Sequence, residues 1–249
     1  MSFRIRGFLI HLSISFILAL IASCVVFYIW YPSPLGQAIG VTSIVFILLG
    51  VDVVAGPLLT LAVCKKGKKS LKFDLSVIVL LQLSAFIYGI HILAQGRPVW
   101  IVFNENEFHI VRAYETDNEY QQKAKPEYQK LSFTGPKWIA IRSPVGDEKK
   151  SIFEGIMKGV IYQERADLYE PISNQIKSVK HSSIDLNRLK KFNALHDVKS
   201  ILLKWPEADA FIPLNSQEKN LVVLVKKENG QIVSLVNLKP YTSPNATFE

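Results

Sequence analysis

Cysteine is scarce in this chain. Its two cysteines, Cys24 and Cys64, lie in or beside apolar runs, and the chain from Arg97 onward contains none. This absence excludes a disulfide framework and a paired-cysteine metal site from the C-terminal part. Cysteine usage therefore carries no information on the cellular compartment.

Charge is scarce before Arg97. That stretch has seven Lys or Arg residues and two acids, Asp52 and Asp74, whereas the remainder has 22 and 19. Most of the net charge of +8 therefore lies in the N-terminal part, chiefly in one lysine-rich loop. The remainder is nearly balanced and has no basic stripe with interleaved aromatics, so we expect no nucleic-acid partner.

Catalytic signatures are also missing. The patterns HExxH, GxGxxG and GxSxG and a P-loop do not occur. Ser216 to Lys219 matches S-x-x-K without the companion motifs, and His109, His181 and His196 have no motif or zinc spacing around them. We therefore expect no enzyme, no catalytic residue, no cofactor, no metal ligand and no small-molecule substrate.

Three apolar runs, at about 7–31, 38–63 and 75–94, predict a transmembrane domain over residues 1–95. Each is long enough to cross a bilayer, which takes about 20 residues. Residues 21–24 of the first run also fit a lipoprotein cleavage box at Cys24. A retained helix is favoured, because the apolar run continues to Trp30 and ends in an aromatic belt.

The positive-inside rule predicts the orientation of these spans. Arg4 and Arg6 precede the first span, and five lysines, Lys65, Lys66, Lys68, Lys69 and Lys72, lie between the second and third. Both basic segments are therefore expected in the cytoplasm, with residues 96–249 forming a periplasmic domain. The lysine loop is also expected to contact membrane lipids; a cytoplasmic docking site is the alternative.

Residues 96–249 mix strand and helix signals. Apolar runs flank short turns at 104–106 and at Asn229-Gly230, and each pair predicts a hairpin. The expected strands are 99–103, 108–111, 138–141, 221–227 and 231–238, and the expected helices are 148–159 and 185–203, the latter with Asp185 as N-cap. The predicted fold class is three N-terminal transmembrane α-helices followed by an α+β extracytoplasmic domain with antiparallel strands.

The middle span contains the string Val51-Asp52-Val53-Val54-Ala55-Gly56-Pro57-Leu58-Leu59-Thr60. Asp52 falls near the midplane, where a charge costs about 2.5 kcal/mol or more. Pro57 removes a backbone donor and favours a kink. Two penalties this close together indicate a helix that packs against protein rather than lipid. The candidate partner-binding residues are Asp52, Gly56, Pro57, Thr60 and Gln82.

Three interpretations of Asp52 stay open. It contacts a partner helix, or it bonds Gln82 at similar depth in the third span, or it belongs to an ion or proton pathway. The pathway usually needs several titratable groups on one route, whereas His11 and His91 lie near the ends of their spans. Likewise, Gly56-Pro57 is either a packing kink, in which the Thr60 hydroxyl satisfies a freed carbonyl, or a groove that accepts another helix.

The string at 51–61, the lysine loop and Gly96–Phe103 resemble the type IV pilin accessory proteins of the TfpX/TfpZ kind, over about the first 115 residues. The resemblance implies a Gram-negative inner-membrane protein that promotes the stability, assembly or surface display of a particular major pilin. It implies no cofactor and no catalytic residue. A type IV pilin has one membrane helix and an outer head, so we expect the second span to line the helix-binding face. The outer domain would recognise the head, for example through a strand edge.

The main alternative is a small membrane transporter or channel component with a regulatory periplasmic domain and Asp52 as its ion site. Three spans with a single charge form a poor ion pathway, so this function would require several copies of the protein to assemble. A membrane-anchored sensor has no room for an output domain, because its cytoplasmic parts are a basic head and an eleven-residue loop. A membrane-tethered envelope enzyme is disfavoured by the missing motifs.

The predicted orientation can be tested with a C-terminal fusion. A reporter that fluoresces only in a reducing cytosol should stay dark, because the domain that carries it is expected outside the cytoplasm. The same reporter fused within the lysine loop should be bright. A bright C-terminal fusion would overturn the orientation.

Overall fold

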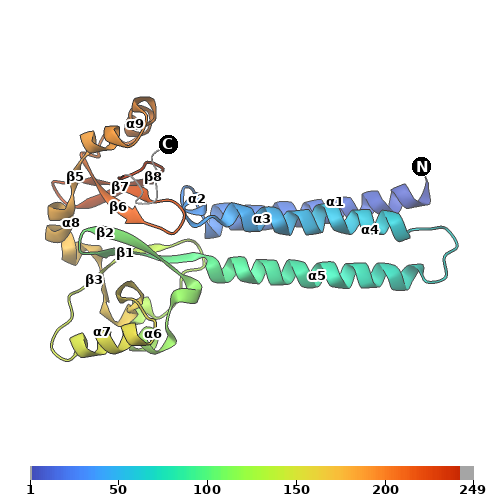
Figure 1. Ribbon diagram of the computed structural model, residues 1–249, viewed down its shortest axis with the longest axis horizontal. Helices are drawn as coiled ribbons and strands as arrows, with labels where there is room; N and C mark the ends of the chain where they lie inside the picture. Colours follow the sequence, from blue (N-terminus) through green and yellow to red (C-terminus); the bar gives the residue numbers. More distant parts are fainter. Residues whose placement is uncertain (1, 242–249) are drawn as a thin grey trace. The chain divides into compact units, whose positions relative to one another are not determined.

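The structure is a computed structural model that describes residues 2–241 (Figure 1). The chain divides into two compact units. The membrane unit comprises residues 1–36 and 40–97, and the C-terminal unit comprises residues 37–39 and 98–249. The end of the expected periplasmic domain, residues 242–249, lies outside the described residues.

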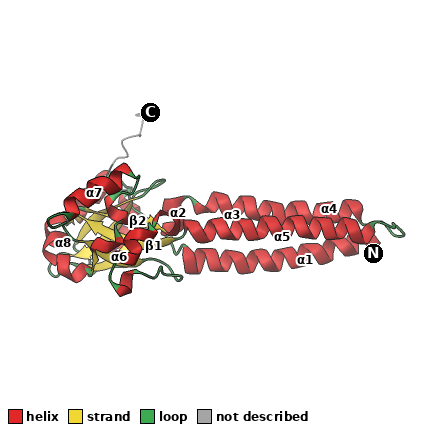
Figure 2. Cartoon of the chain, turned by 90° about the horizontal axis from the view of Figure 1, so that it is seen from below, coloured by secondary structure: helices red, strands yellow, loops and turns green. Residues whose placement is uncertain are grey.

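Three long helical segments form the membrane unit and lie side by side (Figures 1 and 2). They are α1 (Phe3–Cys24) with the π-helix η1 (Val25–Trp30); α3 (Val41–Leu49), the π-helix η2 (Gly50–Ala55) and α4 (Gly56–Val63); and α5 (Leu71–Gly96). The short helix α2 (Leu35–Ile39) follows the first segment. The three segments have 28, 23 and 26 residues and are apolar enough to cross a membrane, so the chain has the features of a membrane protein.

The first segment packs against the middle one along a stripe of small residues. Ser15, Ala19 and Ala22 are the buried residues of α1. A Cβ atom added to Gly7 would lie 2.8 Å from the Cys64 sulfur at the far end of α4, so the two helices run antiparallel. Small side chains let membrane helices approach closely, which favours dispersion contacts in the absence of a hydrophobic driving force.

The C-terminal unit is built on one sheet of eight strands among the described residues. The strands are β1 (Pro98–Asn104), β2 (Glu107–Arg112), β3 (Lys137–Ile141), β4 (Tyr169–Glu170), β5 (Ile184–Asp185), β6 (Ala210–Asn215), β7 (Leu221–Lys226) and β8 (Gln231–Val236). Their order is β4-β3-β1-β2-β6-β7-β8, with β5 paired to β6. The pairs β1–β3 and β2–β6 are parallel, and the other pairs are antiparallel.

Helices cover both halves of this sheet (Figure 1). The α-helices are α6 (Asn118–Lys123), α7 (Glu148–Met157), α8 (Ile176–Ser182) and α9 (Leu195–Leu202). The 3₁₀-helices are η3 (Ala113–Glu115), η4 (Pro126–Tyr128), η5 (Tyr162–Glu164), η6 (Ala166–Leu168), η7 (Ile172–Gln175) and η8 (Leu186–Lys191). One buried cluster joins β1 to β3 with Tyr128, Leu168 and Tyr169, and another joins β6 to β8 with Leu189 and Val198. These clusters stabilise an α+β domain.

The predicted fold class is confirmed, and both predicted hairpins are present. Strands β1 and β2 pair across Glu105-Asn106, and β7 and β8 pair across a turn in which Gly230 has φ 71°. The predicted helix at 185–203 is wrong as a single element. Asp185 does cap η8, accepting from the Asn187 N–H at 2.7 Å, but the chain leaves the helical path before α9 begins at Leu195.

Strand β6 was not expected from the sequence, because Pro213 lies inside its apolar run. The strand pairs with β5 at Ala210 and Phe211 and with β2 at Leu214 and Asn215. Pro213 therefore lies where one neighbour ends and the next begins, and its missing N–H falls between the two pairings.

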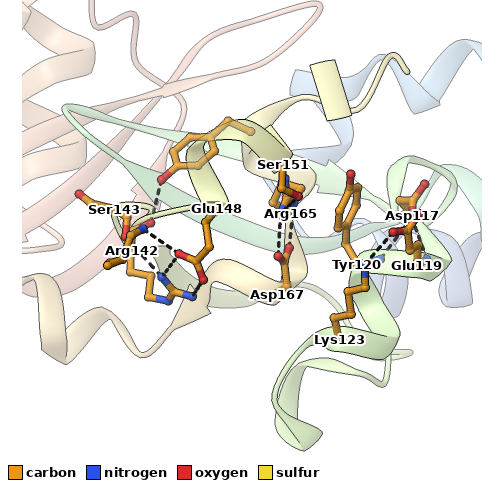
Figure 3. A network of polar contacts seen from close by, with 12 residues as sticks. Asp117, Glu119, Tyr120, Lys123, Arg142, Ser143, Glu148, Ser151, Arg165 and Asp167 are labelled. Carbon is orange, nitrogen blue, oxygen red and sulfur yellow. Dashed lines mark hydrogen bonds and ion pairs between the residues drawn. The ribbon is translucent and has the colours of Figure 1, made fainter. Parts of the chain in front are cut away.

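A buried arginine ties the helices of one half together (Figure 3). Arg165 is 2% exposed and donates to both Asp167 carboxylate oxygens at 2.7 and 2.9 Å and to the Ser151 hydroxyl at 3.2 Å. Its guanidinium lies 3.9 Å from the centre of the Tyr120 ring. Because it contacts α6, α7 and η6, this one side chain connects three short elements.

Helix α7 begins at a second ion pair in the same view (Figure 3). The Glu148 carboxylate accepts from two Arg142 nitrogens, each at 2.7 Å, and from the Val145 N–H at 2.8 Å. The hydrogen bonds from Arg142, followed by the one from Val145, lower the pKa of Glu148 from 4.5 to about 2. The fold therefore favours the ionised form of this carboxylate.

Replacing Glu148 by glutamine should destabilise the protein at neutral pH and not at low pH. A depressed pKa gives stability that is present above the unfolded value of 4.5 and is lost as the pH falls toward about 2. The difference in melting temperature between wild type and Glu148→Gln should therefore shrink between pH 5 and pH 2. Near-ultraviolet circular dichroism of the full-length protein in detergent measures it, with Glu154→Gln, at an exposed position of α7, as the control. A constant difference across this range would contradict the role assigned to the pair.

Candidate functional site

The backbone carbonyl of Asp52 in the middle span has no donor within its own helix. In the π-helix η2, the Gly56 N–H donates to the Val51 carbonyl, one residue further back than in an α-helix. The next donor in this register would be the N–H of residue 57, and Pro57 has none. The carbonyl of Asp52 therefore needs a donor from outside its own helix, since bare backbone polar groups are costly in a membrane.

Gln82 of α5 supplies that donor. Its Nε2 donates to the Asp52 carbonyl at 2.7 Å and to the Ser15 hydroxyl at 3.2 Å, so one amide joins all three helical segments. Gly56 makes this approach possible. A Cβ atom there would lie 2.1 Å from Gln82 Oε1 and 2.4 Å from Nε2, so any side chain at this position would displace the amide. In the string Asp-x-x-x-Gly-Pro, the aspartate thus supplies the carbonyl that accepts from the Gln82 amide, and the glycine leaves space for that amide.

A second polar contact lies between the first and middle segments. His11 Nδ1 and the Thr60 hydroxyl share a hydrogen bond of 2.6 Å. The expectation that Thr60 would satisfy the carbonyl freed by Pro57 is therefore not met; Gln82 bonds that carbonyl and Thr60 bonds His11. The reason is geometric, because the antiparallel packing of α1 on α4 brings His11 level with Thr60.

These polar groups line a cavity of about 380 Å³ within the membrane unit. Its walls come from α1 and α5, with the middle segment between them. The α1 wall is Gly7, Ile10, His11, Ile14, Ser15 and Leu18, the α5 wall is Leu75, Val79, Gln82, Leu83 and Phe86, and the middle segment adds Asp52, Thr60 and Cys64. Both walls follow the spacing of one helix face, so the cavity is a groove that runs along the helices. We call it the membrane groove.

The Asp52 carboxylate is buried in this groove without a partner. The residue is 5% exposed, and neither carboxylate oxygen has a hydrogen bond within residues 2–241. Gln82 bonds the backbone carbonyl of Asp52 and leaves the carboxylate unpaired. A buried, unpaired carboxylate is unfavourable unless something donates to it.

The structure thus brings together three of the five candidate residues in the groove lining, namely Asp52, Thr60 and Gln82. Gly56 and Pro57 are buried beside it and shape the contact with Gln82. Sequence reasoning missed His11 and Ser15 as members of the site. A signal was present, because Gly7, His11, Ser15 and Ala19 recur every four residues as a small or polar stripe on an otherwise large apolar helix.

Two of the residues considered for catalysis, His109 and Ser216, make contacts within the fold of the C-terminal unit. His109 lies 3.2 Å from Glu107, and burial lowers the pKa of its imidazole. The Ser216 hydroxyl donates to the Ala38 carbonyl at 2.6 Å. No group of three or more potential metal-ligating His, Cys, Asp or Glu side chains occurs in residues 2–241.

Strand β8 forms one edge of the sheet in the described part of the C-terminal unit. Strand β8 ends the sheet, pairing with β7 on one side only among the described residues. A groove of about 540 Å³ follows it, lined by Asn229 to Leu235 together with Trp138, Ile172, Ser173 and Ile176. None of these residues is charged. Sheet edges are usually protected by charges, so this edge suits the addition of an extended peptide.

Known proteins resemble this chain along most of its length. A family model described as fimbrial assembly protein FimB matches residues 1–40. The fimbrial assembly proteins of Dichelobacter nodosus serogroups E1 and I are 29% and 27% identical over 241 residues, which are 93% of this chain and 94% of each relative. The protein of serogroups C1 and C2 is 36% identical over 104 residues, 41% of this chain and 79% of the relative. No solved structure matches the chain significantly.

The class of protein is therefore a three-helix membrane protein with an α+β domain attached, whose spans are joined by buried polar contacts. Within that class, the chain belongs to the family of fimbrial assembly proteins. The resemblance to accessory proteins of type IV pili is confirmed at the level of this family.

The Gly56–Gln82 contact makes a sharp prediction about stability. Gly56→Ala should lower the melting temperature of the protein in detergent, because the new Cβ displaces the Gln82 amide and leaves the Asp52 carbonyl unpaired. Bonds of this kind are worth about 0.6 to 2 kcal/mol between membrane helices. Gly50→Ala is the matched control in the same span, since a Cβ there meets nothing within 4 Å.

A double variant identifies the cause. With Gln82→Ala in place, Gly56→Ala should cost little more, because the amide it displaces is already gone. Additive losses would show that Gly56 acts through another contact.

Proposed function

We propose that this protein is a non-enzymatic inner-membrane accessory factor for type IV pilus biogenesis, which binds a major pilin and promotes its stability or assembly. Membership of the fimbrial assembly family supports the role in pilus biogenesis. The named relatives are described by assembly rather than by a reaction, which favours a binding role for this chain.

The membrane groove is the observation that carries the proposal. Its walls extend from Gly7 to Leu18 on α1, a length of about 16 Å at 1.5 Å per residue. Apolar side chains form most of both walls, which matches the surface of a transmembrane helix. A pilin offers one such helix, so the groove and the ligand are complementary in shape and polarity.

The orientation inferred from the basic segments supports the same function. With Arg4, Arg6 and the lysine loop in the cytoplasm, the C-terminal unit lies in the periplasm. A pilin in the inner membrane has its head on that side. One protein could therefore bind a pilin in both the lipid and the aqueous phase.

The edge of β8 is the surface best suited to the pilin head. No further strand pairs with its outer side among residues 2–241, so an extended segment can add there as a strand, and the uncharged groove beside it accepts apolar or small polar side chains. Two modest contacts on one ligand reinforce each other, because the second forms within the complex already made by the first. Holding the helix and the head together would protect a monomeric pilin before it joins the fibre.

Site-specific photocrosslinking tests the groove. A benzoylphenylalanine at Leu83, which lines the groove, should crosslink to the major pilin of the same cell. The matched control is Leu81, two residues away on α5, which is 65% exposed and outside the groove lining. We expect at least a several-fold higher yield of the pilin adduct from position 83. Equal yields, or an adduct from position 81 alone, would contradict helix binding in the groove.

A further inference from the structure

We infer that the transmembrane helix bound in the membrane groove presents a side-chain N–H or O–H donor at the level of Asp52. The inference rests on the proposed function and adds the chemistry by which the groove selects its ligand.

The groove has unpaired acceptors. Asp52 Oδ1, Asp52 Oδ2 and Gln82 Oε1 are buried and have no hydrogen-bond partner within residues 2–241. Both residues line the same cavity. Two residues of the groove lining therefore carry three buried acceptor atoms without donors.

No nearby donor bonds the Asp52 carboxylate in the described residues. Both hydrogens of the Gln82 amide have acceptors, one in the Asp52 carbonyl and one in the Ser15 hydroxyl. His11 Nδ1 and the Thr60 hydroxyl bond each other. The other lining residues, Gly7, Ile10, Ile14, Leu18, Leu75, Val79, Leu83 and Phe86, have apolar or no side chains, and the remaining one, Cys64, has only a weak thiol donor. Within residues 2–241 the membrane unit therefore leaves the Asp52 carboxylate without a donor.

An occupant with a donor removes this deficit, whereas a purely apolar helix leaves it buried. A site with unpaired polar groups discriminates strongly against ligands that lack the matching group, because those groups stay unsatisfied in the complex. In a membrane the alternative to pairing is hydrocarbon, so the preference cannot be relieved by water from the lipid side. Asp52 thereby gives the apolar groove specificity.

A helix fits the site better than a metal ion does. Hard cations such as Ca²⁺ take six to eight oxygen ligands, and three acceptor oxygens lie unpaired here. The cavity of about 380 Å³ is far larger than one ion, and eight of its fourteen lining residues are apolar or glycine. Shape and polarity therefore favour an apolar helix with one polar side chain.

Synthetic transmembrane peptides test this chemistry. The full-length protein in lipid nanodiscs is titrated with a fluorescent Leu/Ala helix that carries a single asparagine, moved in four-residue steps along the peptide. The reference is the same helix without asparagine. Binding should strengthen about 3- to 30-fold at one position only, as expected for a polar pair between membrane helices.

Two variants of the protein assign the effect to Asp52. Asp52→Leu should abolish the advantage of the asparagine peptide. Asp74→Leu, at the other acid of the spans, should keep it, because Asp74 lies at the start of α5 beside Lys68 and outside the groove. The comparison of peptides on the wild-type protein does not depend on how either variant folds.

The outcomes separate this inference from the proposed function. If the peptides with and without asparagine bind equally well, and the pilin also binds, the groove binds helices but the donor requirement is wrong. If neither the peptides nor the pilin bind, the proposed function itself fails. If ²²Na⁺ binding to the nanodisc protein depends on Asp52 while peptide binding does not, the site holds an ion and the inference is overturned.

Discussion

The membrane unit depends on one hydrogen bond, from the Gln82 amide to the backbone carbonyl of Asp52. Pro57 creates the need for it by removing a donor, the π-helix sets which carbonyl is left bare, and Gly56 opens the space through which the amide enters. The same amide reaches Ser15 and so connects the first segment. Gly56 and Pro57 would each weaken an isolated helix, and here both contribute to one contact between helices.

This arrangement leaves the Asp52 carboxylate available. An acid that bonded Gln82 through its side chain would be satisfied within the bundle and would contribute to packing alone. Because the backbone makes that bond, the carboxylate takes no part in the packing contact, and the ligand selection that we propose for it uses a separate group of the same residue. Stability comes from the carbonyl, and the carboxylate remains in a groove whose walls match an apolar helix.

Much of the fold was predictable because its signals are local. Long apolar runs specify the spans, and Asn229-Gly230 between two apolar strands specifies a hairpin. Strand β6 was hidden by Pro213, whose tolerance depends on a break between β5 and β2 that only the assembled sheet has. The candidate site was likewise predictable only where its signals are local. Asp52 and Gln82 could be paired by depth, but their contact through the carbonyl, and the inclusion of His11 and Ser15, depend on helix register, which a single span does not encode.

The bond between Asp52 and Gln82 joins residues that emerge from the ribosome thirty positions apart. During synthesis, the second span therefore waits in the translocon or lipid with a bare carbonyl and an acid until the third arrives. Unpaired polar groups of this kind are costly against lipid. A chain that ends before Gln82 would keep the Asp52 carbonyl without a donor, so insertion of the third span completes the hydrogen bonding of the second.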